Sequence, residues 1–78
     1  MQAFIDELIL SRNQGSSFYR LEAELVFYLG DDTENTLADF CKHTGLYMVR
    51  FRDPEGQMVY KFRRATLEEI SAWLQQEN

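Results

Sequence analysis

The feature that most restricts the fold is a pair of alternating apolar segments joined by a strong turn signal. Residues 46–52 read LYMVRFR, residues 57–64 read QMVYKFRR, and Asp53-Pro54-Glu55-Gly56 separates them. Proline sets φ at the second position of a turn, and glycine tolerates the backbone conformation at its end. The pattern therefore predicts an antiparallel β-hairpin over residues 46–64.

The side chains of this hairpin favour one register. In that register the large apolar groups pair across the strands and share one face: Phe51 with Met58, Val49 with Tyr60, and Tyr47 with Phe62. A shift by one residue would set Arg50 opposite Tyr60 and expose part of the core. We therefore expect the opposite face to carry a mostly polar set, comprising Met48, Arg50, Arg52, Gln57, Val59, Lys61 and Arg63.

Residues 33–44 have the spacing and the end signals of a helix. Asp32 or Thr33 can cap its N-terminus, and Gly45 suits the left-handed backbone position that follows a last helical turn. Apolar residues at helical spacing are expected to face the core: Leu37, Phe40 and Cys41.

Residues 66–76 predict a second helix. Thr66 and Glu69 form a capping box, in which each side chain bonds the backbone N–H of the other residue. The helix is expected to bury four apolar side chains at helical spacing: Leu67, Ile70, Trp73 and Leu74.

Residues 18–29 carry the strongest alternation of the remaining chain and predict a strand. One face would hold Tyr19, Leu21, Ala23, Leu25, Phe27 and Leu29. The other face begins with charged residues and turns apolar at Val26 and Tyr28, so that end should be covered by a helix or by another subunit. A helix through Leu21, Leu25 and Leu29 is the alternative, and it leaves part of the alternation unexplained.

Residues 2–12 place four apolar side chains at helical spacing: Phe4, Ile5, Leu8 and Ile9. Acidic residues lie early in this segment and Arg12 lies late, as the helix dipole favours. We expect a helix here, with a strand as the alternative.

These elements predict an α+β fold in a single domain over residues 1–78, a length that permits one domain. The expected order is α(or β)-β-α-β-β-α. The antiparallel sheet has three strands, or four if residues 2–12 pair with it, and two or three helices. Helices 33–44 and 66–76 are expected to cover the apolar face of the sheet.

The composition excludes several classes of protein. At 45% hydrophobic residues the chain is too apolar for a disordered tail, and no run of 18 apolar residues predicts a membrane span. The N-terminal segment lacks the basic region and cleavage site of a secretory signal. A single cysteine forms no internal disulfide, which favours a reducing compartment, and we expect a cytoplasmic protein.

Charge is segregated along the chain. Residues 1–41 carry a net charge of −6, residues 42–64 carry +4 and residues 65–78 carry −3. In the expected register, four cations share one face of the hairpin: Arg50, Arg52, Lys61 and Arg63. If strand 18–29 joins this sheet, Glu22 and Glu24 would lie beside these cations and form an internal ladder of opposite charges.

The charge pattern suggests a small non-enzymatic interaction protein that acts as a regulator, adaptor or inhibitor of a protein partner. The four cations would contact an acidic patch on that partner. The alternative contact surface, suited to a basic partner, comprises Glu22, Glu24, Asp31 and Asp32.

Two further interpretations stay open. The basic face of the 46–64 hairpin could bind single-stranded nucleic acid, because cations neutralise phosphates and aromatic rings stack on unpaired bases. The chain could also form a homodimer through Val26, Tyr28 and a neighbouring edge strand.

No motif indicates catalysis, a cofactor or a metal site. Cys41 and His43 are two residues apart, and helical residues at that spacing do not face each other as a nucleophile and base must. Asp31, Asp32 and Glu34 lack the glycine and the distal glutamate of a calcium-binding loop. A solvated turn and helix cap explains these acids.

Overall fold

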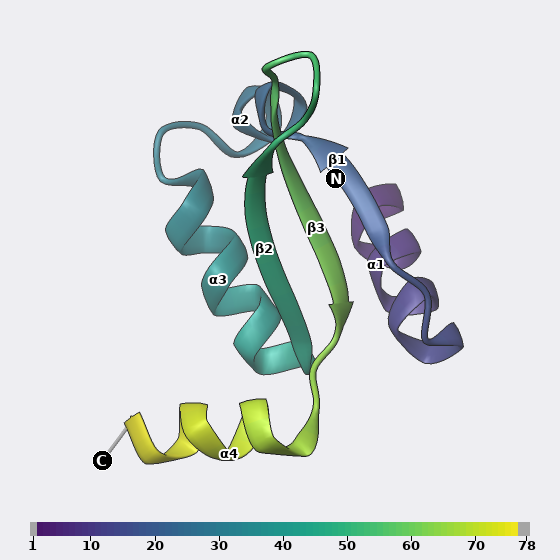
Figure 1. Cartoon of the computed structure of the whole chain (residues 1–78), viewed down its shortest axis with the longest axis vertical. Helices are drawn as coiled ribbons and strands as arrows, with labels where there is room; N and C mark the ends of the chain where they lie inside the picture. Colours follow the sequence, from purple (N-terminus) through teal and green to yellow (C-terminus); the bar gives the residue numbers. More distant parts are fainter. Residues whose placement is uncertain (1, 77–78) are drawn as a thin grey trace.

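The computed structural model describes residues 2–76 and shows an alternation of helices with an antiparallel sheet (Figure 1). In chain order the elements are α1 (Gln2–Gln14), β1 (Phe18–Leu21), α2 (Glu22–Leu29), α3 (Thr33–Thr44), β2 (Leu46–Arg52), β3 (Met58–Arg64) and α4 (Leu67–Gln76). The predicted α+β class is confirmed, and residues 2–12 belong to a helix, as expected.

The sheet has the order β1-β3-β2, so β3 is its central strand and pairs antiparallel with both neighbours. One face of the sheet packs against α1 and α3, with α2 at the end near the 53–57 turn (Figure 1). The buried core between these layers comprises Leu8, Leu25, Leu37, Cys41, Leu46, Tyr60 and Phe62. Because these helices cover one face of the antiparallel sheet, its other face is open to solvent or to a partner.

Helix α3 confirms the predicted bounds and the predicted C-terminal glycine, but not the predicted side-chain cap at its N-terminus, because Asp32 makes no capping bond and the Thr33 hydroxyl donates to the Gly30 carbonyl. It spans Thr33–Thr44, with Leu37 and Cys41 buried and Phe40 packed against the core. Gly45 adopts the left-handed conformation, with φ 71° and ψ 34°, and its N–H bonds the carbonyl of Cys41. A residue without a Cβ ends the helix here because this conformation costs glycine nothing.

Helix α4 begins with the predicted capping box but does not bury the predicted stripe. The Glu69 carboxylate accepts the Thr66 N–H at 2.8 Å, and the Thr66 hydroxyl accepts the Glu69 N–H at 3.2 Å. The helix crosses the end of the sheet instead of covering its apolar face (Figure 1). Its apolar residues are consequently half-buried (Ile70 and Trp73) or exposed (Leu67 and Leu74).

The predicted strand over residues 18–29 is wrong beyond Leu21. The chain is extended only at Phe18–Leu21 and turns directly into α2. Leu25 and Leu29, four residues apart, meet the core from one side of that helix, and the acidic side chains of its first turn suit the helix dipole. The alternation was misleading because a helix rich in apolar residues also shows apolar residues at every second position.

The hairpin register differs by one residue from the prediction, so that Arg50 pairs with Tyr60 and Phe51 with Val59. The turn explains the shift. The Gly56 N–H bonds the Asp53 carbonyl, as expected for a turn over residues 53–56. Gly56 has φ +87°, however, and the next bond between the strands joins the Asp53 N–H to the Gln57 carbonyl. A type I turn followed by a left-handed residue adds one residue to the connection.

Candidate functional site

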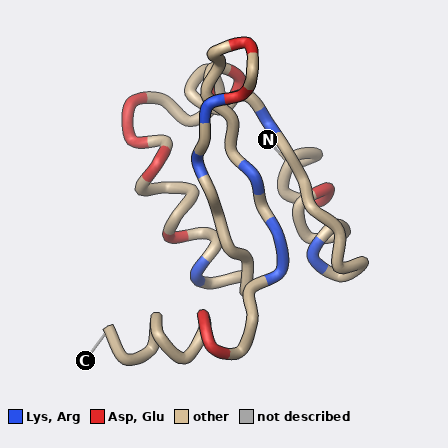
Figure 2. Tube along the Cα trace, viewed as in Figure 1, with Lys and Arg blue, Asp and Glu red and all other residues tan. Residues whose placement is uncertain are grey.

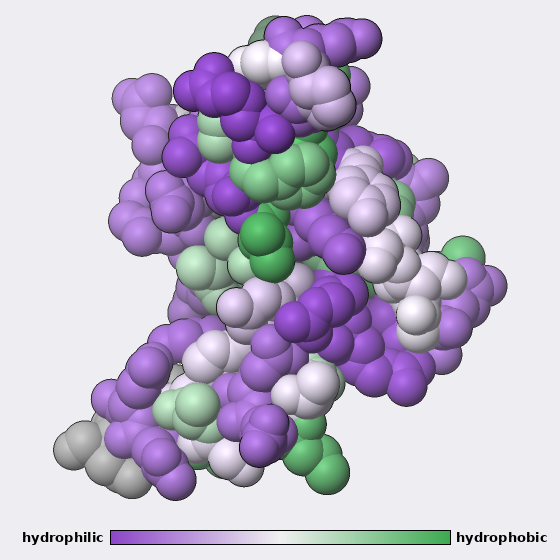
Figure 3. Space-filling view, in the orientation of Figure 1, coloured by the Kyte–Doolittle hydropathy of each residue, from purple (hydrophilic) through white to green (hydrophobic). Residues whose placement is uncertain are grey.

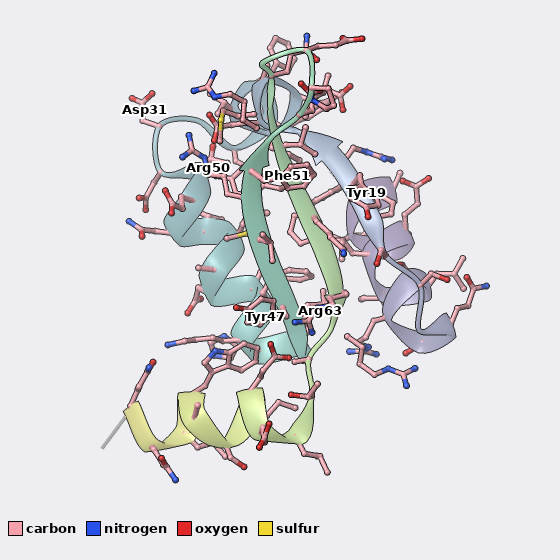
Figure 4. All side chains as sticks on the ribbon, in the orientation of Figure 1. Tyr19, Asp31, Tyr47, Arg50, Phe51 and Arg63 are labelled. Atoms are coloured by element: carbon pink, nitrogen blue, oxygen red, sulfur yellow. The ribbon has the colours of Figure 1, made fainter. Side chains whose placement is uncertain are left out.

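The register shift decides which side chains lie on the uncovered face of the sheet, which we call the open face. Residues that pair across antiparallel strands share a face. The open face therefore carries Tyr19, Leu21, Tyr47, Val49, Phe51, Val59, Lys61 and Arg63. Apolar groups form a strip over the middle of this side of the molecule (Figure 3), and Tyr19, Phe51, Tyr47 and Arg63 lie along it (Figure 4).

Aromatic rings from both edge strands meet across the central strand at one end of the open face. Tyr19 of β1 and Phe51 of β2 lie edge to face, with ring centroids 6.4 Å apart. The Lys61 ammonium of β3 lies over the Tyr19 ring at 5.9 Å from its centroid. Tyr19 is 50% exposed and Val49 is 37% exposed, so solvent reaches this group of side chains.

The other end of the open face is bound to α4. The Tyr47 ring stacks on Trp73 with centroids 6.5 Å apart, and the Arg63 guanidinium lies 4.3 Å from the Tyr47 centroid. Arg63 also donates two hydrogen bonds of 2.9 Å to the Glu69 carboxylate. This pairing, helped by the Thr66 N–H, lowers the pKa of Glu69 from 4.5 to about 2.

Arg50 and Arg52 do not share a face with Lys61 and Arg63, contrary to the prediction. Arg50 lies on the side of the sheet that faces the helices and forms a two-pronged ion pair with Glu22, whose pKa falls below its usual 4.5 through these bonds. Arg52 donates to the Gly56 carbonyl at 2.9 Å. The expected surface of four cations is therefore split between the two faces.

The predicted acidic contact surface is also divided. Glu22 and Glu24 lie in the first turn of α2, whereas Asp31 and Asp32 lie in the turn after its last residue. An eight-residue helix separates the two pairs by about 12 Å. Figure 2 shows acidic positions spread over α3 and the loops at this end. Glu22 forms an ion pair with Arg50, and the Asp32 carboxylate accepts a hydrogen bond from the Asn35 side-chain amide at 2.8 Å.

The outer side of α2 forms a second exposed surface, in a segment for which the sequence analysis preferred a strand and gave a helix as the alternative. Phe27 is 83% exposed, Tyr28 is 62% exposed and their rings meet edge to face at 5.4 Å. Val26 and Tyr28 were expected to be covered, but within residues 2–76 Val26 stays 41% exposed and Tyr28 stays 62% exposed. The signal was present in the sequence, since EAELVFYL has apolar residues on every side of a helix.

Cys41 and His43, the candidates for a nucleophile and a base, differ in their exposure to solvent. Cys41 is buried, and desolvation raises the pKa of its thiol to about 12. His43 is exposed and bonds the Asp39 carbonyl through Nδ1 at 2.8 Å. Among residues 2–76, no three His, Cys, Asp or Glu side chains gather closely enough to hold a metal ion. Within the same range, no helix has both the length and the apolar character needed to cross a membrane.

The comparisons with known proteins give no match. No protein-family model, no curated protein and no solved structure is significantly similar to the chain.

Proposed function

We propose that this protein is a non-enzymatic interaction protein that binds a protein partner through the open face of its sheet. The observation that supports it is the solvent-accessible group of Tyr19, Val49 and Phe51 beside Lys61. Aromatic residues are enriched in the energetically important centres of protein interfaces. A sheet face left without helices provides a flat, rigid platform for them.

The charge of this platform indicates the chemistry of the partner. Lys61 takes part in none of the ion pairs found among residues 2–76, whereas Arg50 and Arg63 each have a carboxylate partner. A carboxylate on the partner, surrounded by apolar groups, would therefore pair with Lys61. Such a pair accelerates the encounter of the two surfaces and fixes their orientation.

A photo-cross-linking experiment tests this proposal. A photoreactive phenylalanine analogue replaces Val49 on the open face and, as the control, Leu10 on α1, which is also an exposed apolar residue. We expect a specific cross-linked protein at position 49 alone. Purified afterwards, that protein should bind the wild-type chain and lose affinity at least tenfold for Lys61→Glu. Equal cross-linking at both positions, or equal binding of Lys61→Glu, would contradict the proposal.

A second candidate function is single-stranded nucleic-acid binding on the same face. The observation in its favour is that Lys61 and Arg63 lie beside the rings of Tyr19 and Tyr47 on one open sheet face. Aromatic platforms with nearby cations stack unpaired bases and hold the phosphate backbone. Against it, Glu69 offsets Arg63, and the chain has a net charge of −5 that repels phosphates.

Fluorescence anisotropy with mixed-sequence single-stranded RNA and DNA separates the two functions. The measurements are made at roughly 50 and 200 mM salt, where phosphate contacts differ strongly in strength. Lys61→Glu is compared with Arg52→Glu, a matched charge reversal on the opposite face. Salt-sensitive binding that Lys61→Glu alone abolishes would establish the nucleic-acid function. Absence of binding at the lower salt would leave the protein partner as the ligand of the open face.

A further inference from the structure

Helix α2 has two acidic residues in its first turn, but its apolar side chains point to every side, and one of these sides faces solvent. Leu25 is buried and Leu29 packs against the core, whereas Val26, Phe27 and Tyr28 point outward. Helices that are hydrophobic all round are normally covered on every side. The outer side of α2 therefore has the composition of a contact surface, and it is separate from the open face of the sheet.

A hollow lies beside these exposed side chains. It has a volume of about 480 Å³ and is lined by Leu21, Glu22, Ala23, Val26, Gln57 and Met58. Ala23, which contributes only a methyl group, lies one helical turn before Phe27. An exposed ring and a concave apolar site of suitable chemistry are thus adjacent on one surface.

We propose that the partner of this surface is a second copy of the chain, and that the Phe27 ring of each copy occupies the hollow beside Ala23 of the other. A two-fold axis beside α2 makes both contacts at once, because such an interface uses the same patch twice. The two α2 helices then run antiparallel, and the small side chain of Ala23 permits their close approach.

The area agrees with a weak, reversible dimer. Phe27, 83% exposed, and Tyr28, 62% exposed, offer roughly 300 Å² per copy, given about 150–250 Å² for a fully buried aromatic side chain. Val26, Met58 and the rim of the hollow add to this. Over two copies the rings give roughly 600 Å², which lies in the class of small, transient interfaces below about 1,200 Å², so we expect association only at high protein concentration.

The charges around the patch predict the response to salt. Glu22, which lines the hollow, is already paired with Arg50, so no unpaired charge is buried there. Glu24 and Asp31 are exposed at the two ends of α2, and each copy has a net charge of −5. Salt screens the repulsion between the copies. The dimer should therefore tighten with salt, which is opposite to the behaviour of nucleic-acid binding.

Sedimentation equilibrium over a wide range of concentrations, roughly 5 to 500 µM, tests for a weak dimer of this kind. The mass should rise from the chain mass of 9.2 kDa toward twice that value. Phe27→Ala should weaken the association at least tenfold. Leu67→Ala is the matched control, because Leu67 is 84% exposed but lies on α4. A constant mass of 9.2 kDa, or equal weakening by both variants, would overturn the proposal.

Mixing two variants tests the arrangement of ring and hollow. Phe27→Ala removes the ring, and Ala23→Gln fills the hollow with a helix-favouring polar side chain. Each variant alone should associate at least tenfold more weakly than the wild type. In the mixture, the ring of the Ala23→Gln chain can enter the hollow of the Phe27→Ala chain, which restores one of the two contacts. We expect at least tenfold tighter association in the mixture than in either component. No gain on mixing would overturn the proposed geometry.

Discussion

Tyr47 and Trp73 stack with ring planes only 11° apart, and this contact joins the edge strand β2 to the C-terminal helix α4. The helix buries none of its residues fully, so it depends on a small number of such contacts. The stack and the Arg63–Glu69 ion pair attach α4 to the same end of the open face.

Tyr47→Ala should release α4 while the sheet and the other helices persist. A stacked pair contributes about 0.5–1.5 kcal/mol beyond the area that it buries. Trp73 is the only tryptophan, so its fluorescence emission should shift to longer wavelength, and amide hydrogens of α4 should exchange faster. Tyr47→Phe retains the ring and should preserve both signals. Unchanged exchange in Tyr47→Ala would show that other contacts hold the helix.

The ion pair between Arg63 and Glu69 predicts a loss of stability in acid. The pKa of Glu69 falls from 4.5 to about 2 in the folded protein, because Arg63 and the Thr66 N–H bond its carboxylate. A lowered pKa stabilises the fold above pH 4.5, and this contribution disappears as the pH falls toward 2. Urea unfolding at pH 7, 4 and 2.5 should show a smaller decline for Glu69→Gln than for the wild type. Parallel declines would contradict the assignment.

Gly56 determines the geometry of the 53–57 turn through its backbone. Its φ is +87°, and a Cβ placed there would meet no atom within 4 Å. Gly56→Ala should therefore cost about 1–2 kcal/mol from backbone conformation alone. Gly56→Asn should cost less, because asparagine tolerates the left-handed region. Urea midpoints of the three proteins measure the difference, and equal midpoints for Ala and Asn would refute this explanation.

Cys41 should be chemically inert in the folded protein. It is 3% exposed, and burial raises the pKa of its thiol to about 12, so thiolate is scarce at neutral pH. A thiol-specific reagent at pH 8 should label Cys41 only as fast as the chain unfolds, and urea should accelerate the labelling. Rapid labelling of the native chain would show that α3 opens locally at this position.

Elements whose signals are local were predicted well from the sequence. The bounds of helix α3 and its C-terminal glycine agree with the prediction, as does the capping box that begins α4. The hairpin was located correctly because its turn residues are distinctive. In each case a few neighbouring residues determine the backbone conformation.

The predictions were wrong where two alternative structures would each bury apolar side chains. Both faces of the hairpin are largely apolar, with Leu46 and Met48 on one face of β2 and Val49 and Phe51 on the other, so hydrophobic pattern could not select the register. The segment that forms α2 was predicted as a strand because its outer side is also apolar. Consequently the predicted cations were divided between two faces, and the exposed aromatic groups were overlooked.

The turn at Gly56 also determines which side chains of β2 lie on the open face, and therefore which ligands that face can bind. A chain one residue shorter at this turn would rotate β2 relative to β3, because a shift of one residue exchanges the faces of a strand. Arg50 and Arg52 would then join Lys61 and Arg63 on the outside, and Phe51 would point toward the helices. Deletion of one residue would thus bring Arg50 and Arg52 to the open face and remove Phe51 from it, without any amino-acid substitution.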